Sequence, residues 1–207
     1  MTAGLAPTRG ERTRTAILIC AEELFAERGI DGVTLREIAR TAGQSNVSAV
    51  QYHFGSKEQL VSAILDRHQD VIDERRRVLL DDQERAGAMH DLDGLMAVLV
   101  QPVAAELDSP SGRAYLRIQA ERLRERSLRP ATRLLSTRIS RSLGWDPERS
   151  DPLADRFVAL LLFVALADRA REEVSGQAKK KGRKPFVTGL MRALLGIFQT
   201  FSPQERA

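Results

Sequence analysis

The sequence predicts an all-α fold in which an N-terminal three-helix head precedes a larger helical body, with about nine helices in all. Three observations predict it. Apolar residues recur at helical spacing in almost every segment. Alternating runs rich in β-branched and aromatic residues, which would indicate strands, are absent. Glycines, prolines and capping residues divide the chain into helical segments. The first three helices are short, so we expect a head over residues 1–56 and a body over residues 57–207.

Composition sets limits on the class of protein. The single cysteine, Cys20, excludes an internal disulfide in this 207-residue chain. The longest apolar stretch, 157–167, is much shorter than the roughly 20 residues of a membrane span. Residues 1–10 have no secretory pattern, so we expect a cytoplasmic protein without membrane association. The net charge is +4, but the seven cations and seven anions of residues 1–60 cancel. DNA binding therefore depends on where individual residues lie.

The helices of the head are delimited by capping signals. The first is expected from about Arg12 to Arg28, with Gly29 as its C-cap. Thr34 and Glu37 have the spacing of a capping box and begin a second helix that ends near residues 42–43. A third helix is expected over 46–54.

The helices of the body are longer. Residues 56–59 form a second capping box, which opens a helix reaching about residue 85. A proline, Pro102, is expected to kink the next helix. A polar, basic linker is expected over 176–185. The remaining helices are expected at about 91–107, 112–126, 130–144, 152–174 and 186–201.

Residues 34–54 have the pattern of a helix-turn-helix. The first helix of such a motif packs on a support through apolar residues such as Leu35 and Ile38. Gly43 allows the sharp reversal in the turn. In the second helix Val47 and Val50 can anchor inward, while polar and aromatic side chains face outward. Residues 44–54 contain no lysine or arginine, so base reading falls to glutamine, asparagine and serine, which bond to base edges in the major groove.

The segment AEELFAERGIDGVTLREIARTAGQSNVSAVQYHFGSKEQL resembles the N-terminal domain of the tetracycline-repressor (TetR) family, and the resemblance covers roughly residues 12–62. The matching residues are Ala21, Leu24, Phe25, Gly29, Thr34, Ile38, Ala39, Ala42, Gly43, Tyr52, Phe54, Ser56, Lys57 and Leu60. The interval from Gly43 to Phe54 is one residue longer than is usual in the family, so the alignment of residues 45–48 shifts by one position.

The resemblance implies a sequence-specific transcriptional regulator, a repressor that a small-molecule effector releases from a palindromic operator in double-stranded DNA. We expect phosphates to meet Lys57 and Thr34 at helix N-termini. The expected DNA-binding residues are Thr34, Arg36, Gln44, Ser45, Asn46, Ser48, Gln51, Tyr52, His53 and Lys57. A core position is the alternative for Tyr52. Arg9, Arg12 and Arg14 suggest a basic arm or, alternatively, a solvated terminus.

The resemblance also implies a homodimer made by the last two helices, and an effector pocket within the middle helices. The expected dimer residues are Phe157, Leu161, Val164, Leu190, Leu194, Ile197 and Phe198. The expected pocket residues are Leu65, His68, Met96, Val100, Tyr115, Leu116, Gln119, Trp145 and Phe163. Periodicity alone does not separate pocket from core, and burial of both C-terminal helices within one subunit is the alternative to the dimer.

Two further groups of cations are open to two interpretations. The basic run 179–184 is either a second nucleic-acid contact or a solvated loop, and its distance from the head in sequence favours the loop. Nine arginines between residues 113 and 141 form either exposed helix faces or a site for an acidic ligand.

The pattern of an enzyme is missing from the sequence. His68 and His90 have no partner at metal-ligand spacing, and neither a phosphate-binding glycine loop nor a nucleophile elbow occurs. We therefore expect no catalysis, no metal and no cofactor. The functional alternative is a helical protein-interaction module whose head does not read DNA.

Overall fold

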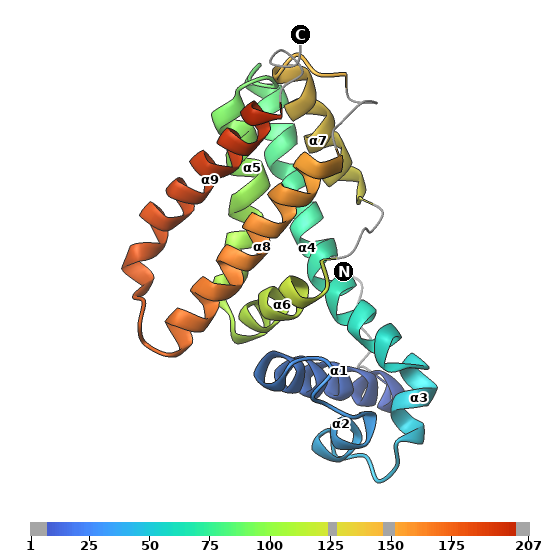
Figure 1. Ribbon diagram of the computed structural model, residues 1–207. Helices are drawn as coiled ribbons and strands as arrows, with labels where there is room; N and C mark the ends of the chain where they lie inside the picture. The colour runs from blue at the N-terminus through green and yellow to red at the C-terminus, as the bar shows by residue number, and fades with distance from the viewer. Residues whose placement is uncertain (1–7, 124–127, 147–151, 202–207) are drawn as a thin grey trace, which may run out of the picture. The chain divides into compact units, whose positions relative to one another are not determined.

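The helices fall into two compact units, Met1–Arg67 and His68–Ala207, in the computed structural model (Figure 1). The structure describes residues 8–123, 128–146 and 152–201. Within these ranges it contains nine α-helices, two short 3-10 helices and no strand, which confirms the all-α prediction. Helix α4 (Lys57–Arg85) belongs to both units, and the predicted boundary at residues 56 and 57 lies at its start.

The N-terminal unit packs α1 (Arg9–Arg28), α2 (Leu35–Thr41) and α3 (Ser48–Phe54) around one core with the start of α4. Helix α1 begins earlier than predicted because the Thr8 hydroxyl accepts a hydrogen bond from the backbone of Glu11, whose carboxylate accepts one from the backbone of Thr8. The fully buried apolar residues of this unit are Ile17, Ala21, Phe25, Val33, Ile38, Leu60 and Ile64.

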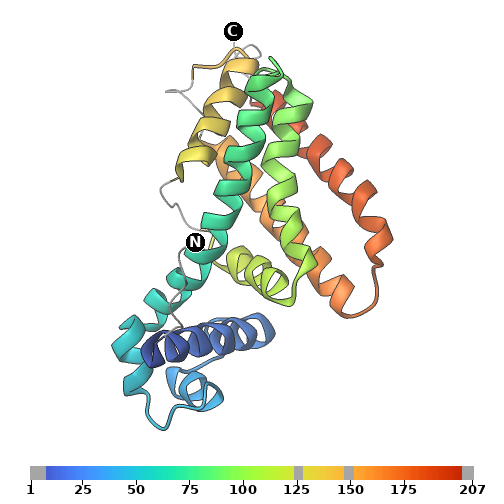
Figure 2. The same ribbon diagram turned by 180° about the vertical axis from the view of Figure 1, so that it is seen from behind.

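The C-terminal unit contains the rest of α4 and five further α-helices (Figures 1 and 2). These are α5 (Leu92–Ala104), α6 (Pro110–Glu121), α7 (Pro130–Ser142), α8 (Pro152–Val174) and α9 (Arg183–Thr200), with 3-10 helices at Ala105–Asp108 (η1) and Lys180–Gly182 (η3). Helix α6 packs against α8, α9 packs against both α5 and α8, and α5 packs against α7.

Several helix ends differ from the prediction. Helix α5 continues through Pro102 and tightens into a 3-10 turn at Ala105. Helix α6 ends at Glu121, and the predicted end at 126 is outside the described residues. Helix α9 begins at Arg183 inside the predicted linker, because Pro185 in the first turn removes only an N–H that has no partner in the helix.

Polar contacts join α4 to α7. The Asp73 carboxylate accepts hydrogen bonds from the backbone N–H groups of Ala131 (3.1 Å) and Thr132 (2.8 Å) at the start of α7. The buried Arg138 donates to the Leu80 carbonyl (3.0 Å) and to the Glu84 carboxylate (2.7 Å). Part of the arginine-rich stretch 113–141 therefore connects helices within the unit.

None of the helices in the described ranges is both long enough and apolar enough to span a membrane.

Candidate nucleic-acid interface

The predicted capping box at the start of α2 is present. The Thr34 hydroxyl oxygen accepts from the Glu37 backbone N–H (3.2 Å), and the Glu37 carboxylate accepts from the Thr34 N–H (2.9 Å). These hydrogen bonds from Thr34 are the main reason that the pKa of Glu37 is lowered. Glu37 also pairs with Arg28 at 3.2 Å, which ties the start of α2 to the end of α1.

The turn between α2 and α3 depends on Gly43. Its φ of +68° is in the left-handed region, where glycine has no steric penalty. After it, the Gln44 N–H donates to the Ala39 carbonyl at 2.9 Å, and the Gln44 side chain donates to the Ala42 carbonyl at 3.1 Å. The chain thus reverses closely at the end of α2, as a helix-turn-helix requires.

The start of α3 is set by Asn46. Its side-chain oxygen accepts hydrogen bonds from the Ser48 N–H and from the Ser48 hydroxyl, both at 3.0 Å. This side-chain turn keeps Asn46 out of the helix, which begins at Ser48 instead of at the predicted residue 46. The pattern of an asparagine two residues before a serine was the available signal for this side-chain turn.

Helix α3 has one buried face and one exposed face. Val50 and Phe54 are buried against the core of the N-terminal unit, whereas Gln51 is exposed and Tyr52 is 86% exposed. The alternative of a core position for Tyr52 is therefore wrong. A large aromatic side chain that the fold leaves open to solvent, next to polar groups, suits contact with another molecule.

The start of α4 carries the second predicted capping box. The Ser56 N–H donates to the Gln59 side chain at 3.1 Å, and the Gln59 N–H donates to the Ser56 hydroxyl at 3.2 Å. Lys57 is the first residue of α4 and is half-buried. Its charge and the partial positive charge of the helix N-terminus both favour an anion.

Cations near α2 and α3 are more accessible than the zero net charge of residues 1–60 suggests. Two of the acidic residues form ion pairs with arginines. The buried Glu22 pairs with Arg67 at 2.9 Å, and Glu37 pairs with Arg28. Arg36 and Arg40 are exposed, and neither forms an ion pair among the described residues. Arg40, at the end of α2, was not among the predicted contacts.

All ten predicted DNA-binding residues lie in the N-terminal unit on α2 or its N-cap, on α3, in the turn between the two helices or at the start of α4, and none is buried. The three arginines of the suggested basic arm differ, because Arg9, Arg12 and Arg14 are helical residues of α1. The Arg14 guanidinium lies over the Phe54 ring, 4.9 Å from its centroid.

Eight of the nine predicted pocket residues are buried, and Phe163 is half-buried. The structure brings three of their aromatic rings together: His68 stacks on Tyr115 at 4.6 Å, and Tyr115 meets Phe163 edge-on at 6.4 Å. Trp145 lies elsewhere, against Phe198. Leu65 falls in the N-terminal unit. Met96, Val100 and Leu116 are packed core residues, and Gln119 accepts a hydrogen bond from Gln69 at 3.0 Å.

The predicted dimer residues divide by exposure. Phe157 and Val164 of α8 are about two-fifths exposed (43% and 40%). Leu161 and Ile197 are half-buried. In contrast, Leu190, Leu194 and Phe198 of α9 are buried within their own chain.

Comparisons with known proteins agree with a helix-turn-helix in the N-terminal unit. Residues 17–64 match the family described as bacterial regulatory proteins, tetR family. The chain is 47% identical over 60 residues to the HTH-type transcriptional repressor Rv3405c of Mycobacterium tuberculosis H37Rv, covering 29% of this chain and 31% of that protein. It thus spans less than a third of the length of the first curated relatives.

Longer alignments cover most of the chain. The HTH-type transcriptional regulator UidR of Escherichia coli K12 is 24% identical over 195 residues, which are 90% of this chain and 96% of UidR. Among solved structures, NalD, the secondary repressor of the MexAB-OprM multidrug efflux pump in Pseudomonas aeruginosa, matches with a TM-score of 0.53. It is 26% identical, and the match covers 88% of this chain and 95% of NalD.

Proposed function

We propose, because residues 17–64 match the tetR family of bacterial regulatory proteins, that the chain is a transcriptional repressor that binds a palindromic operator as a homodimer in the cytoplasm. The observation that carries the proposal is the outward face of α3, where Ser48, Gln51 and Tyr52 are exposed opposite the buried Val50 and Phe54. This is the arrangement by which a recognition helix enters the major groove.

The contacts divide by chemistry. Gln51 and Ser48 can bond to base edges, and a glutamine amide suits adenine in particular. Arg36 in α2 precedes α3 in the sequence, and Lys57 at the start of α4 follows it. Both can contact DNA phosphates, and Thr34 adds a polar group at the start of α2. Because α3 contains neither lysine nor arginine, the contacts from α2 and α4 supply the electrostatic attraction.

Selection of bound sequences from a random pool of DNA duplexes, at about 0.15 M salt, tests this proposal. We expect an enriched inverted repeat. A Gln51→Ala, Tyr52→Ala variant should lose the enrichment while keeping its fold, because both side chains are exposed. Gln177→Ala, an exposed glutamine of the C-terminal unit, serves as the control and should select the same repeat.

If the folded protein enriches no sequence, the alternative of a helical protein-interaction module gains support. Its predicted behaviour differs, because partner binding would survive the Gln51→Ala, Tyr52→Ala substitution.

The dimer is proposed to form through an apolar stripe on α8. Leu153, Phe157, Leu160 and Val164 recur at helical spacing and are each more than a third exposed. The predicted α9 residues Leu190, Leu194 and Phe198 are already covered by their own chain. Two recognition helices held about 34–36 Å apart would then read two half-sites.

Release by an effector is proposed to involve the aromatic group of His68, Tyr115 and Phe163 with Gln119. These polar and aromatic side chains lie in the interior of the C-terminal unit, where His68 also bonds to the buried Glu106 at 2.7 Å, and polar groups in such a setting orient bound ligands. The measurement is the release of operator DNA across a set of small organic compounds. Gln119→Leu should bind operator normally and lose the response to an active compound.

A further inference from the structure

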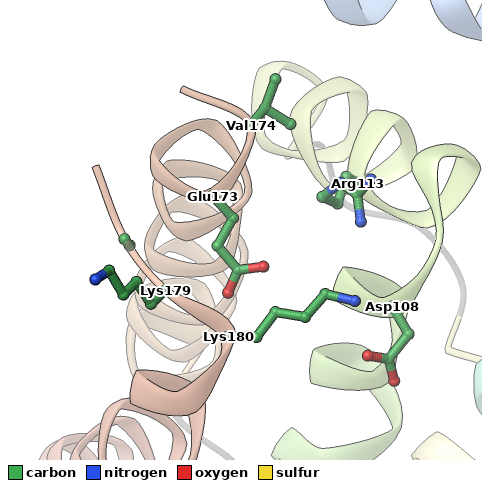
Figure 3. A pocket seen from close by; sticks show the side chains of 7 residues that line it. Asp108, Arg113, Glu173, Val174, Lys179 and Lys180 are labelled. Atoms are coloured by element: carbon green, nitrogen blue, oxygen red, sulfur yellow. The ribbon is translucent and has the colours of Figure 1, made fainter. Parts of the chain in front are cut away.

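A charged pocket of about 400 Å³ lies in the C-terminal unit, away from the predicted effector residues (Figure 3). Asp108 and Arg113 line one side of it, where η1 leads into α6. Glu173, Lys179 and Lys180 line the other side, at the end of α8 and the connection to α9. The volume is within the range of roughly 300–1,000 Å³ that is typical of small-molecule sites.

The carboxylates of the pocket are already neutralised. Glu173, whose side chain is 6% exposed, accepts hydrogen bonds from Arg183 (2.7 Å) and Arg169 (3.0 Å). The bonds from Arg183 are the main cause of its lowered pKa. Arg183 also donates to the Asp108 carboxylate. Two carboxylates are therefore balanced by two guanidinium groups, and neither has a charge left for a cationic ligand.

The remaining cations of the pocket form no ion pair with a carboxylate of the described residues. Arg113 donates one hydrogen bond, from Nη1 to the Leu107 carbonyl at 2.8 Å. Lys180 extends across the pocket, and Arg113 faces it from α6 (Figure 3). Over the described ranges, no ion pair joins Arg113, Lys179 or Lys180 to a carboxylate. The pocket thus carries an excess of positive charge next to the apolar side chains of Val174 and Ala178.

We propose that this pocket binds a small organic anion, a carboxylate or a phosphate ester. Its acidic group pairs with Arg113 and Lys180, since guanidinium and ammonium groups form strong charge-assisted hydrogen bonds to such oxygens. Its carbon part contacts Val174 and Ala178. The anion bridges residues that are far apart in the sequence, which explains why part of the basic run 179–184 and one arginine of the stretch 113–141 converge on one site.

Isothermal titration of the full-length protein at constant ionic strength tests the site, with succinate and glycerol 3-phosphate as probes of the two anion types. We expect saturable binding of at least one probe, and the preferred probe identifies the acidic group. Lys180→Gln should weaken binding about tenfold or more, the effect of losing one charge-assisted hydrogen bond.

Lys184→Gln is the matched control. It removes the same charge from the same basic run, but Lys184 does not line the pocket, so binding should stay within about twofold of the original affinity. Absence of saturable binding of both probes to the folded protein overturns the proposal, as does equal weakening by the two substitutions. The titration contains no DNA, so its outcome is separate from that of the operator selection.

Discussion

Asn46 accepts two hydrogen bonds from Ser48, through the backbone N–H and the hydroxyl, both at 3.0 Å. Two residues predicted to read bases are thus paired with each other at the start of α3. The asparagine oxygen orders the recognition helix, while its amide N–H₂ group is the part that can donate to DNA.

Substitutions at Asn46 separate these two roles. Asn46→Asp keeps the acceptor oxygen, so thermal stability should be retained, but it replaces the amide by a charge that repels phosphate and should weaken operator binding at least tenfold. Asn46→Ala should weaken operator binding and should also lower the free energy of unfolding by about 1 kcal/mol. Thermal unfolding and titration with labelled operator measure the two effects. Full affinity in Asn46→Asp would contradict a direct DNA contact.

The pairing of Arg67 with Glu22 should stabilise the N-terminal unit. Arg67 donates two hydrogen bonds of 2.9 Å to a carboxylate that is 2% exposed. Arg67→Ala leaves this charge buried and should lower the free energy of unfolding by about 2 kcal/mol. Arg85→Ala, which breaks the exposed pair with Asp82 on the same helix, should cost about 0.5 kcal/mol or less. If denaturant unfolding shows that Arg67→Ala and Arg85→Ala lower the free energy of unfolding equally, the buried pair contributes no more than the exposed one.

The contacts of Glu173 should make stability depend on pH. Arg183 lowers the pKa of Glu173 from its ordinary value of 4.5, so the folded state holds the proton less tightly than the unfolded chain. The stabilisation is therefore complete above about pH 4.5 and is lost as pH falls through the lowered pKa. Glu173→Gln should be less stable than the original protein at pH 7, and the difference should shrink below pH 4.5. Chemical denaturation across this range tests it, and a constant difference would show that another group is responsible.

The exposed stripe of α8 should control assembly. Phe157→Glu with Val164→Glu places two charges on the proposed dimer face and should give a monomer in sedimentation. Val78→Glu, at a similarly exposed valine of α4 (45%), is the control and should remain dimeric. Persistence of the dimer in the double variant would move the interface to another surface.

Local signals in the sequence predicted most of the helical architecture. The capping boxes at Thr34 and Ser56 and the positive φ at Gly43 are set by neighbouring residues, and all are present in the structure. Where local signals misplaced an end, as at Asn46 and Pro185, a short-range hydrogen bond or a missing N–H explains the difference. The outward face of α3 follows from helical periodicity once Val50 and Phe54 are taken as anchors.

Contacts between residues far apart in the chain were decided by the tertiary structure alone. The sequence showed a basic run at 179–184 and arginines after residue 113, but only packing of α6 near the end of α8 brings Arg113 and Lys180 to one pocket. In the same way, periodicity marked α8 and α9 as apolar without showing that Leu194 is covered within its own chain while Phe157 remains exposed. A sequence pattern reports the polarity of a helix face, whereas the tertiary structure determines what that face contacts.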